Sequence, residues 1–88
     1  MNDLDLEIFM HKYRYPQIIS FQIRFVNRQI SQCIHHNDWE SIRQIMTQSC
    51  GISYDGVSES CLLSSLSFVY FSMYMEYIRR ETRIFLNT

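Results

Sequence analysis

The chain has 88 residues and a net charge of −1, enough for one small domain but without the overall field that would attract nucleic acid or acidic lipid. Hydrophobic residues make up 47% of the sequence and aromatic residues 15%, whereas there are only two glycines and one proline. This composition excludes a disordered tail and predicts a packed, regular structure. We therefore expect a single domain that spans residues 1–88.

The cysteines and the N-terminal residues indicate the cellular compartment of the protein. Cys33, Cys50 and Cys61 are odd in number and lack the spacing of a disulfide framework, so we expect free thiols that pack as small hydrophobic groups. The N-terminus, MNDLDLEIF, is acidic where a secretory signal is basic, and it has no long apolar core. These features predict a cytoplasmic protein, although a chain exported without a cleaved signal has the same features.

Residues 3–14 are predicted to form a helix that ends before Pro16. The acidic residues come early in this segment and Lys12 and Arg14 come late, which matches the direction of the helix dipole. The residue before a proline is pushed out of helical geometry, so the segment YRYP is expected to end the helix.

Two periodicities compete in the segment after Pro16. Apolar and polar residues alternate from Ile19 to Phe25, which is typical of a half-buried strand. A longer helical pattern places on one stripe Ile19, Ile23, Val26, Ile30, Cys33 and Ile34. The opposite, polar side of that helix would carry Ser20, Arg24, Asn27, Arg28, Ser31 and His35. The greater length of the helical match, and a proline near the start, predict a helix over residues 17–26, with a strand as the alternative.

The next segment, HHNDWESIRQIMTQSCG, has the signals of a third helix. Asn37 followed by Glu40 three residues later forms a capping-box pattern at its start. Gly51 can adopt the left-handed conformation that ends a helix. The buried side of this helix is predicted to consist of Trp39, Ile42 and Met46.

The remainder of the chain is predicted to be one long helix. Asp55 and Gly56 are a turn signal, and helical periodicity then continues over residues 58–85. The predicted helices have short connections, and no strand pattern is stronger than the helical ones. The sequence therefore predicts an all-α fold, a small bundle of about four helices with a long C-terminal helix.

This last helix carries two apolar faces. The first is a broad stripe, expected to pack on the core, that consists of Leu62, Leu66, Val69, Tyr70, Met73, Tyr77 and Ile84. The second resembles a coiled-coil seam with a repeat of seven residues and consists of Cys61, Phe68, Phe71, Met75, Ile78 and Phe85. Such a helix either lies at the centre of its bundle or binds a partner on its second face. A helix of about 28 residues would be about 42 Å long, against roughly 30 Å for a compact domain of this size, which favours a partner.

The sequence predicts neither a membrane span nor a catalytic or metal-binding site. The uncharged window, residues 60–75, is shorter than the roughly 20 residues of a membrane span and contains five serines, so no span is predicted. Cys33, His35 and His36 are metal-ligand types, but Cys-x-His-His matches no common zinc spacing and a helix would point Cys33 away from His35. No glycine-rich loop or facing pair of carboxylates is present, so we predict no catalytic residue, no metal site and no cofactor.

The leading hypothesis is a binding protein without catalytic activity, of the chaperone, adaptor or inhibitor type. It would cover part of another protein, or a second copy of itself as a homodimer, through the seam of its last helix. The predicted contact residues are the anchors Phe68, Phe71, Met75 and Ile78, with Arg79 and Arg83 at the rim. In size and helical character the chain is similar to small accessory proteins such as secretion chaperones, anti-regulators, antitoxins and immunity proteins, an analogy of scale without a shared motif.

The alternative hypothesis is a small dimeric regulator that binds nucleic acid. Arg24 and Arg28 lie one helical turn apart, and Arg79, Arg80 and Arg83 cluster near the C-terminus. Arginine clusters of this kind can contact phosphates. The net charge of −1 and the glutamates among the last three arginines make nucleic acid the less favoured partner.

Overall fold

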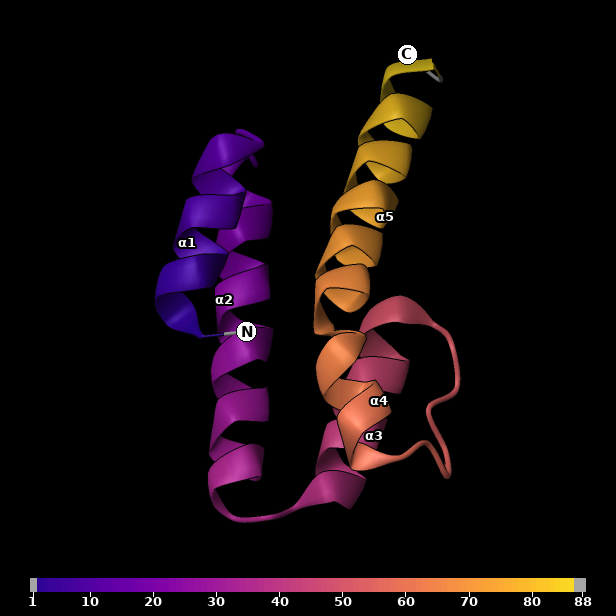
Figure 1. The fold of residues 1–88 in the computed structure, drawn as a ribbon. Helices are drawn as coiled ribbons and strands as arrows, with labels where there is room; N and C mark the ends of the chain where they lie inside the picture. The colour runs from indigo at the N-terminus through magenta and orange to yellow at the C-terminus, as the bar shows by residue number, and fades with distance from the viewer. Residues whose placement is uncertain (1, 87–88) are drawn as a thin grey trace.

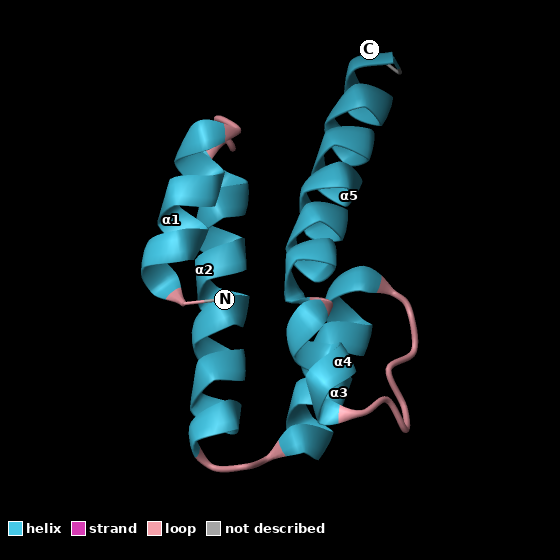
Figure 2. Ribbon diagram, viewed as in Figure 1, coloured by secondary structure: helices cyan, strands magenta, loops and turns pink. Residues whose placement is uncertain are grey.

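The computed structural model describes residues 2–86, which form five α-helices and no strand (Figures 1 and 2). The helices are α1 (Asp3–Lys12), α2 (Gln17–His35), α3 (Trp39–Cys50), α4 (Glu59–Ser64) and α5 (Leu66–Leu86). The predicted all-α bundle with a long C-terminal helix is confirmed. The body measures 45 × 27 × 17 Å, which is thin enough that each long helix keeps one side at the surface.

The long helix α2 forms the centre of the arrangement. In Figure 1 the chain rises through α1, descends along α2 and turns back, so that α3 packs on the lower half of α2 and α5 on its upper half. The helical interpretation of residues 17–26 is confirmed, and Ile19, Ile23 and Ile30 are buried as the stripe predicted. These three side chains form the part of the core that α2 contributes.

Two residues assigned to the polar side of α2 are buried instead. Ser20 and Asn27 are almost fully covered, because α1 packs against that side of α2 and Tyr70 of α5 reaches Asn27. The Tyr70 hydroxyl donates a hydrogen bond of 2.7 Å to Asn27 Oδ1. A buried polar group is tolerated when it is hydrogen-bonded, and this bond provides such a partner.

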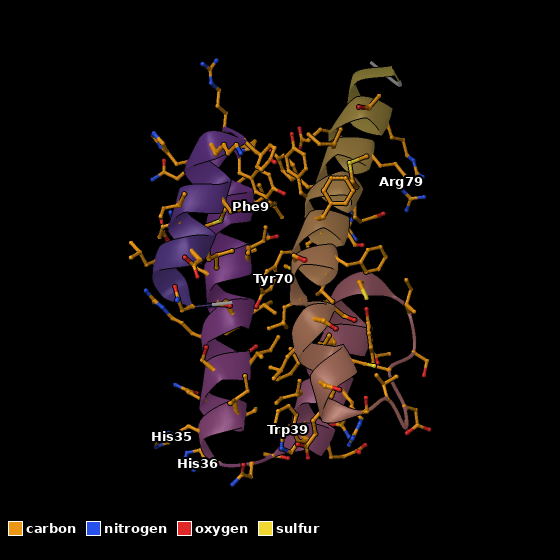
Figure 3. The ribbon with its side chains drawn as sticks, in the orientation of Figure 1. Phe9, His35, His36, Trp39, Tyr70 and Arg79 are labelled. Carbon is orange, nitrogen blue, oxygen red and sulfur yellow. The ribbon has the colours of Figure 1, made fainter. Side chains whose placement is uncertain are left out.

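The aromatic residues of α1 and its following loop join the first helix to the last. The rings of Tyr15 and Tyr74 stack with their centroids 4.2 Å apart, and Phe9 meets Tyr15 edge-on at 5.6 Å. Figure 3 shows Phe9 at the side of α1 and α2 that faces α5. Leu6 and Met10 of α1 complete this side of the core. Burial also raises the pKa of the Tyr15 hydroxyl above its ordinary value.

The start of α3 differs from the predicted capping box. The cap is Asp38, whose carboxylate accepts from the backbone N–H of Ser41 at 3.2 Å and from its hydroxyl at 2.6 Å. Asn37 instead has a φ of 56° in the preceding turn, a left-handed conformation that asparagine adopts more easily than most residues. The end of α3 is as predicted, with Gly51 at a φ of 74° and its N–H bonded to the Thr47 carbonyl at 2.8 Å.

The Asp38 cap makes a testable prediction about acid stability. The two hydrogen bonds from Ser41 lower the pKa of the Asp38 carboxyl below its ordinary value. Its contribution to folding is therefore present above the unfolded pKa, near 3.9, and is lost as the pH falls through the folded pKa. We expect Asp38→Ala to lower the melting temperature by several degrees at pH 7, and by much less at pH 3. Melting curves at both pH values check this, and an equal loss at both would contradict the cap's role.

The prediction of one continuous helix over residues 58–85 is wrong, because the helix breaks at Ser65. The N–H of Ser65 donates to the carbonyls of Cys61 and Leu62 at 3.1 Å each, and the hydroxyls of Ser64 and Ser65 also donate to the Cys61 carbonyl, at 3.1 and 2.7 Å. Serine hydroxyls that compete for backbone carbonyls bend and interrupt helices. The last helix therefore has 21 residues.

The core-facing stripe of the last segment is in place despite the break. Leu62, Leu66, Val69 and Tyr70 are buried, and Met73 and Tyr77 pack against them. The side chain of Ile84, also assigned to this stripe, lies outside the described residues. α3 covers the stripe from the other side with Ile42 and Met46, while Trp39 is half-buried beside them.

Candidate protein-binding face

One side of α5 presents large apolar side chains to solvent. We call the residues Phe68, Phe71, Met75 and Ile78 the α5 face. Phe68, Phe71 and Met75 are 48%, 48% and 47% exposed, and Ile78 is half-buried. The neighbouring residues Val69 and Tyr70 are fully buried. α5 thus has a core side and an exposed apolar side, and the alternative of a helix buried at the centre of the bundle is wrong.

A shallow groove of about 520 Å³ runs along the α5 face. Among the residues that the structure describes, those that line it all belong to α5, namely Phe68, Phe71, Ser72, Met75, Glu76, Ile78 and Arg79. Four residues at positions i, i+3, i+4 and i+7 form the hole that receives a side chain from a facing helix. The groove contains two such holes in succession, and Ser72 and Met75 belong to both of them. This surface has the shape that a second helix packs against.

The rim of the groove carries a local ion-pair cluster. Arg79 Nη2 donates to Glu76 Oε1 at 2.8 Å, and Arg80 Nε lies 3.3 Å from the same oxygen. The Arg79 hydrogen bond is the main reason that the pKa of Glu76 is below its ordinary value. Figure 3 shows Arg79 pointing away from α2, on the outer side of α5. The predicted rim residue Arg79 therefore lines the groove, whereas Arg83 is exposed but does not line it.

One member of the predicted seam does not join the α5 face, and another has a side chain that is not described. Cys61 is exposed, but it belongs to α4, before the break at Ser65. The side chain of Phe85 lies outside the described residues. The break separates Cys61 from the four residues of the α5 face.

A second apolar surface, on α2, was not predicted from the sequence. We call Ile18, Phe21 and Phe25 the α2 face; they are 60%, 69% and 58% exposed. Their spacing of three and four residues is itself a helical signal. In the sequence, Phe21 and Phe25 are apolar positions of the strand alternative and lie outside the helical stripe that contains Ile19 and Ile23. Leu4 and Ile8 of α1 are also exposed.

The arginine clusters are largely engaged by carboxylates. Arg24 donates from Nη2 to Glu7 Oε2 at 2.9 Å and from Nε to Glu7 Oε1, and this contact lowers the pKa of Glu7. Arg79 and Arg80 share Glu76, as described above. Such pairs are partly exposed and add little stability, but they neutralise charge that nucleic acid would need.

The histidines and cysteines do not converge on one site. His35 and His36 lie at the C-terminal end of α2, with ring centroids 5.4 Å apart, and Figure 3 shows both near the turn that leads to Trp39. Cys33 is half-buried, and burial raises the pKa of its thiol, which disfavours the reactive thiolate. Among the side chains that the structure describes, no group of three or more His, Cys, Asp or Glu is placed to hold a metal ion.

Comparison of the chain with protein-family models, with curated proteins and with solved structures finds no match. Within residues 2–86, none of the helices has the length and apolar character to cross a membrane.

Proposed function

We propose that the protein is a small helical binding module without catalytic activity, of the chaperone, adaptor or inhibitor type. Its α5 face would bind a partner protein and cover part of that partner's surface until it is used. The observation that carries this proposal is the groove along α5, where three large apolar side chains remain about half exposed on a helix whose other side is core. Aromatic rings and methionine are the side chains that anchor protein interfaces.

The size of the exposed surface supports a partner. A fully exposed phenylalanine or similar side chain has a surface of about 150–250 Å². Because three such side chains are about half exposed, the α5 face exposes roughly 300 Å² of apolar surface. That value is within the range of the largest apolar patch on a typical monomer, and such patches are often functional. The two holes along the groove favour an amphipathic helix as the element that would fill it.

The direct test is affinity purification of the tagged full-length protein from its native cells. We expect the wild-type chain to retain a foreign protein in stoichiometric amount, and the Met75→Glu variant to lose it by more than tenfold, because a carboxylate would have to be buried in the interface. Mass spectrometry identifies the retained protein, and light scattering gives the stoichiometry of the complex.

A matched control is Leu63→Glu, which introduces the same charge at an exposed apolar residue of α4 that does not line the groove. This variant should retain the partner. The proposal fails if Met75→Glu keeps the partner, or if circular dichroism shows that Met75→Glu unfolds the chain. The second result would mean that Met75 contributes to the core.

We further infer that the protein works in the cytoplasm. Cys33, Cys50 and Cys61 are free thiols, and Cys61 is exposed. A reducing compartment is where free exposed cysteines are normally maintained.

The nucleic-acid alternative receives less support from the described contacts. Arg24, Arg79 and Arg80 are each bound to a carboxylate, so a phosphate would have to displace Glu7 or Glu76. Retention on heparin at low salt, lost steeply as salt is raised, would favour this alternative over the protein-binding one.

A further inference from the structure

The two holes of the groove along α5 differ in their chemistry. The first is apolar apart from one hydroxyl and is formed by Phe68, Phe71, Ser72 and Met75. The second lies one turn further along the helix, includes an ion pair, and is formed by Ser72, Met75, Glu76 and Arg79. A helix that packs in the groove therefore meets an apolar hole and then a charged one.

The charged hole carries an excess of positive charge. Arg79 Nη2 donates to Glu76 Oε1 at 2.8 Å, and Arg80 Nε lies 3.3 Å from the same oxygen. Two guanidinium groups thus share one carboxylate, which leaves a net charge of +1 on these three side chains. The side chain of Arg79 is 63% exposed and a guanidinium has several N–H groups, so Arg79 can bind a second carboxylate while it keeps the first.

The stability of α5 does not account for a cation at position 79. The helix dipole favours cations in the last turn, where Arg83 lies, but Arg79 is almost two turns before the end of α5 at Leu86. An exposed ion pair between residues three apart, such as Glu76 and Arg79, contributes little to stability. Arg79 does line the groove, and Figure 3 shows it pointing away from α2. A charge in such a place selects the partner and fixes its register.

We propose that the partner of the α5 face is an amphipathic helix that carries an apolar side chain for the first hole and, one helical turn away, an aspartate or glutamate that binds Arg79. This inference rests on the proposed function and specifies the chemistry of the partner. A carboxylate can accept two parallel N–H groups from a guanidinium, which fixes its position along the groove. A basic side chain there would meet the excess positive charge, and an apolar one would remove water from Arg79 without replacing it.

The test compares Arg79→Glu with Arg80→Glu in the affinity purification described above. Both changes remove an arginine bound to Glu76 and reverse the same charge on the same helix. Arg80, however, lines a different depression, between α2 and α5, together with Ile19 and Gln22. Since both arginines are exposed, circular dichroism should show the same helical signal for the two variants.

We expect Arg79→Glu to lower the retained amount of the partner by about tenfold or more, and Arg80→Glu by about twofold or less. The reason is that only a glutamate at position 79 would face the carboxylate of the partner. Equal losses in the two variants, or no loss in Arg79→Glu, would overturn the proposal.

A reciprocal change in the partner identifies the carboxylate itself. Once mass spectrometry has identified the retained protein, replacing the acidic residue of its binding helix with lysine should restore association with Arg79→Glu and not with Arg80→Glu. If no such replacement restores association, the proposal is wrong.

Met75→Glu separates this inference from the proposed function. If Met75→Glu loses the partner and Arg79→Glu keeps it, the α5 face is the binding surface and only the chemistry assigned to the partner is wrong. A wild-type chain that retains no protein in stoichiometric amount would overturn both.

Discussion

Val69→Asp is expected to unfold the protein, whereas Phe68→Asp, one residue earlier, is expected to leave it folded. Val69 is fully buried, whereas Phe68, about 100° further round the helix, is about half exposed. An ionised carboxylate at position 69 would cost several kcal/mol in desolvation, in addition to the lost packing of the valine. The total stability of a domain of this size is only about 4–13 kcal/mol. The same charge at position 68 would remain hydrated.

Far-UV circular dichroism and thermal melts distinguish the two variants. Val69→Asp should lose most of its helical signal at 25 °C, and Phe68→Asp should keep it with a small change in melting temperature. Since both variants place the same residue in the same helix, helix propensity is matched and only the direction of the side chain differs. Equal destabilisation of the two would mean that α5 is covered on both sides, and the α5 face would then be core.

Asn27→Ala is expected to lower the free energy of unfolding by about 2–4 kcal/mol. The substitution leaves the buried Tyr70 hydroxyl without the acceptor that it contacts at 2.7 Å, and it opens a small cavity between α2 and α5. Tyr70→Phe removes the hydroxyl instead and keeps the ring in place, so its cost should be smaller, about 1–2 kcal/mol. Urea denaturation at 25 °C measures both values.

The double variant tests whether the bond itself is responsible. If it is, Asn27→Ala combined with Tyr70→Phe should be less destabilising than the sum of the two single changes, by about 1 kcal/mol. Strict additivity would show that the two residues act through separate contacts. The outcome also bears on how α5 is held, because this buried bond joins it to α2 across 43 positions of sequence.

The parts of the fold that were predictable from the sequence are those set by local pattern. The buried stripe of Ile19, Ile23 and Ile30 follows from helical spacing, and Gly51 at a φ of 74° follows from its ability to adopt the left-handed conformation. Phe68, Phe71 and Met75 could be separated from the core side of α5 for the same reason.

The parts that were not predictable depend on tertiary contacts or on competition between neighbouring groups. Asn27 lies among polar positions of α2, and the approach of Tyr70 gives it a buried hydrogen bond that the spacing of residues in α2 does not reveal. Both Asn37 and Asp38 can cap a helix, and the turn that leaves α2 selects Asp38. The break at Ser65 arises from side-chain hydroxyls that compete for one carbonyl, which an apolar pattern does not record.

The path of the chain through the bundle has a consequence for folding kinetics. Helices that follow one another in sequence pack on one another, α1 on α2, α2 on α3, α3 on α4 and α4 on α5, so most contacts close short loops. Folds dominated by local contacts reach the native state in microseconds to milliseconds. The docking of α5 on α2 and on α3 must wait for a segment that is distant in sequence. The helices α1 to α3 can pair as soon as they are made, but the core is complete only when α5 brings Leu66, Val69 and Tyr70 to it.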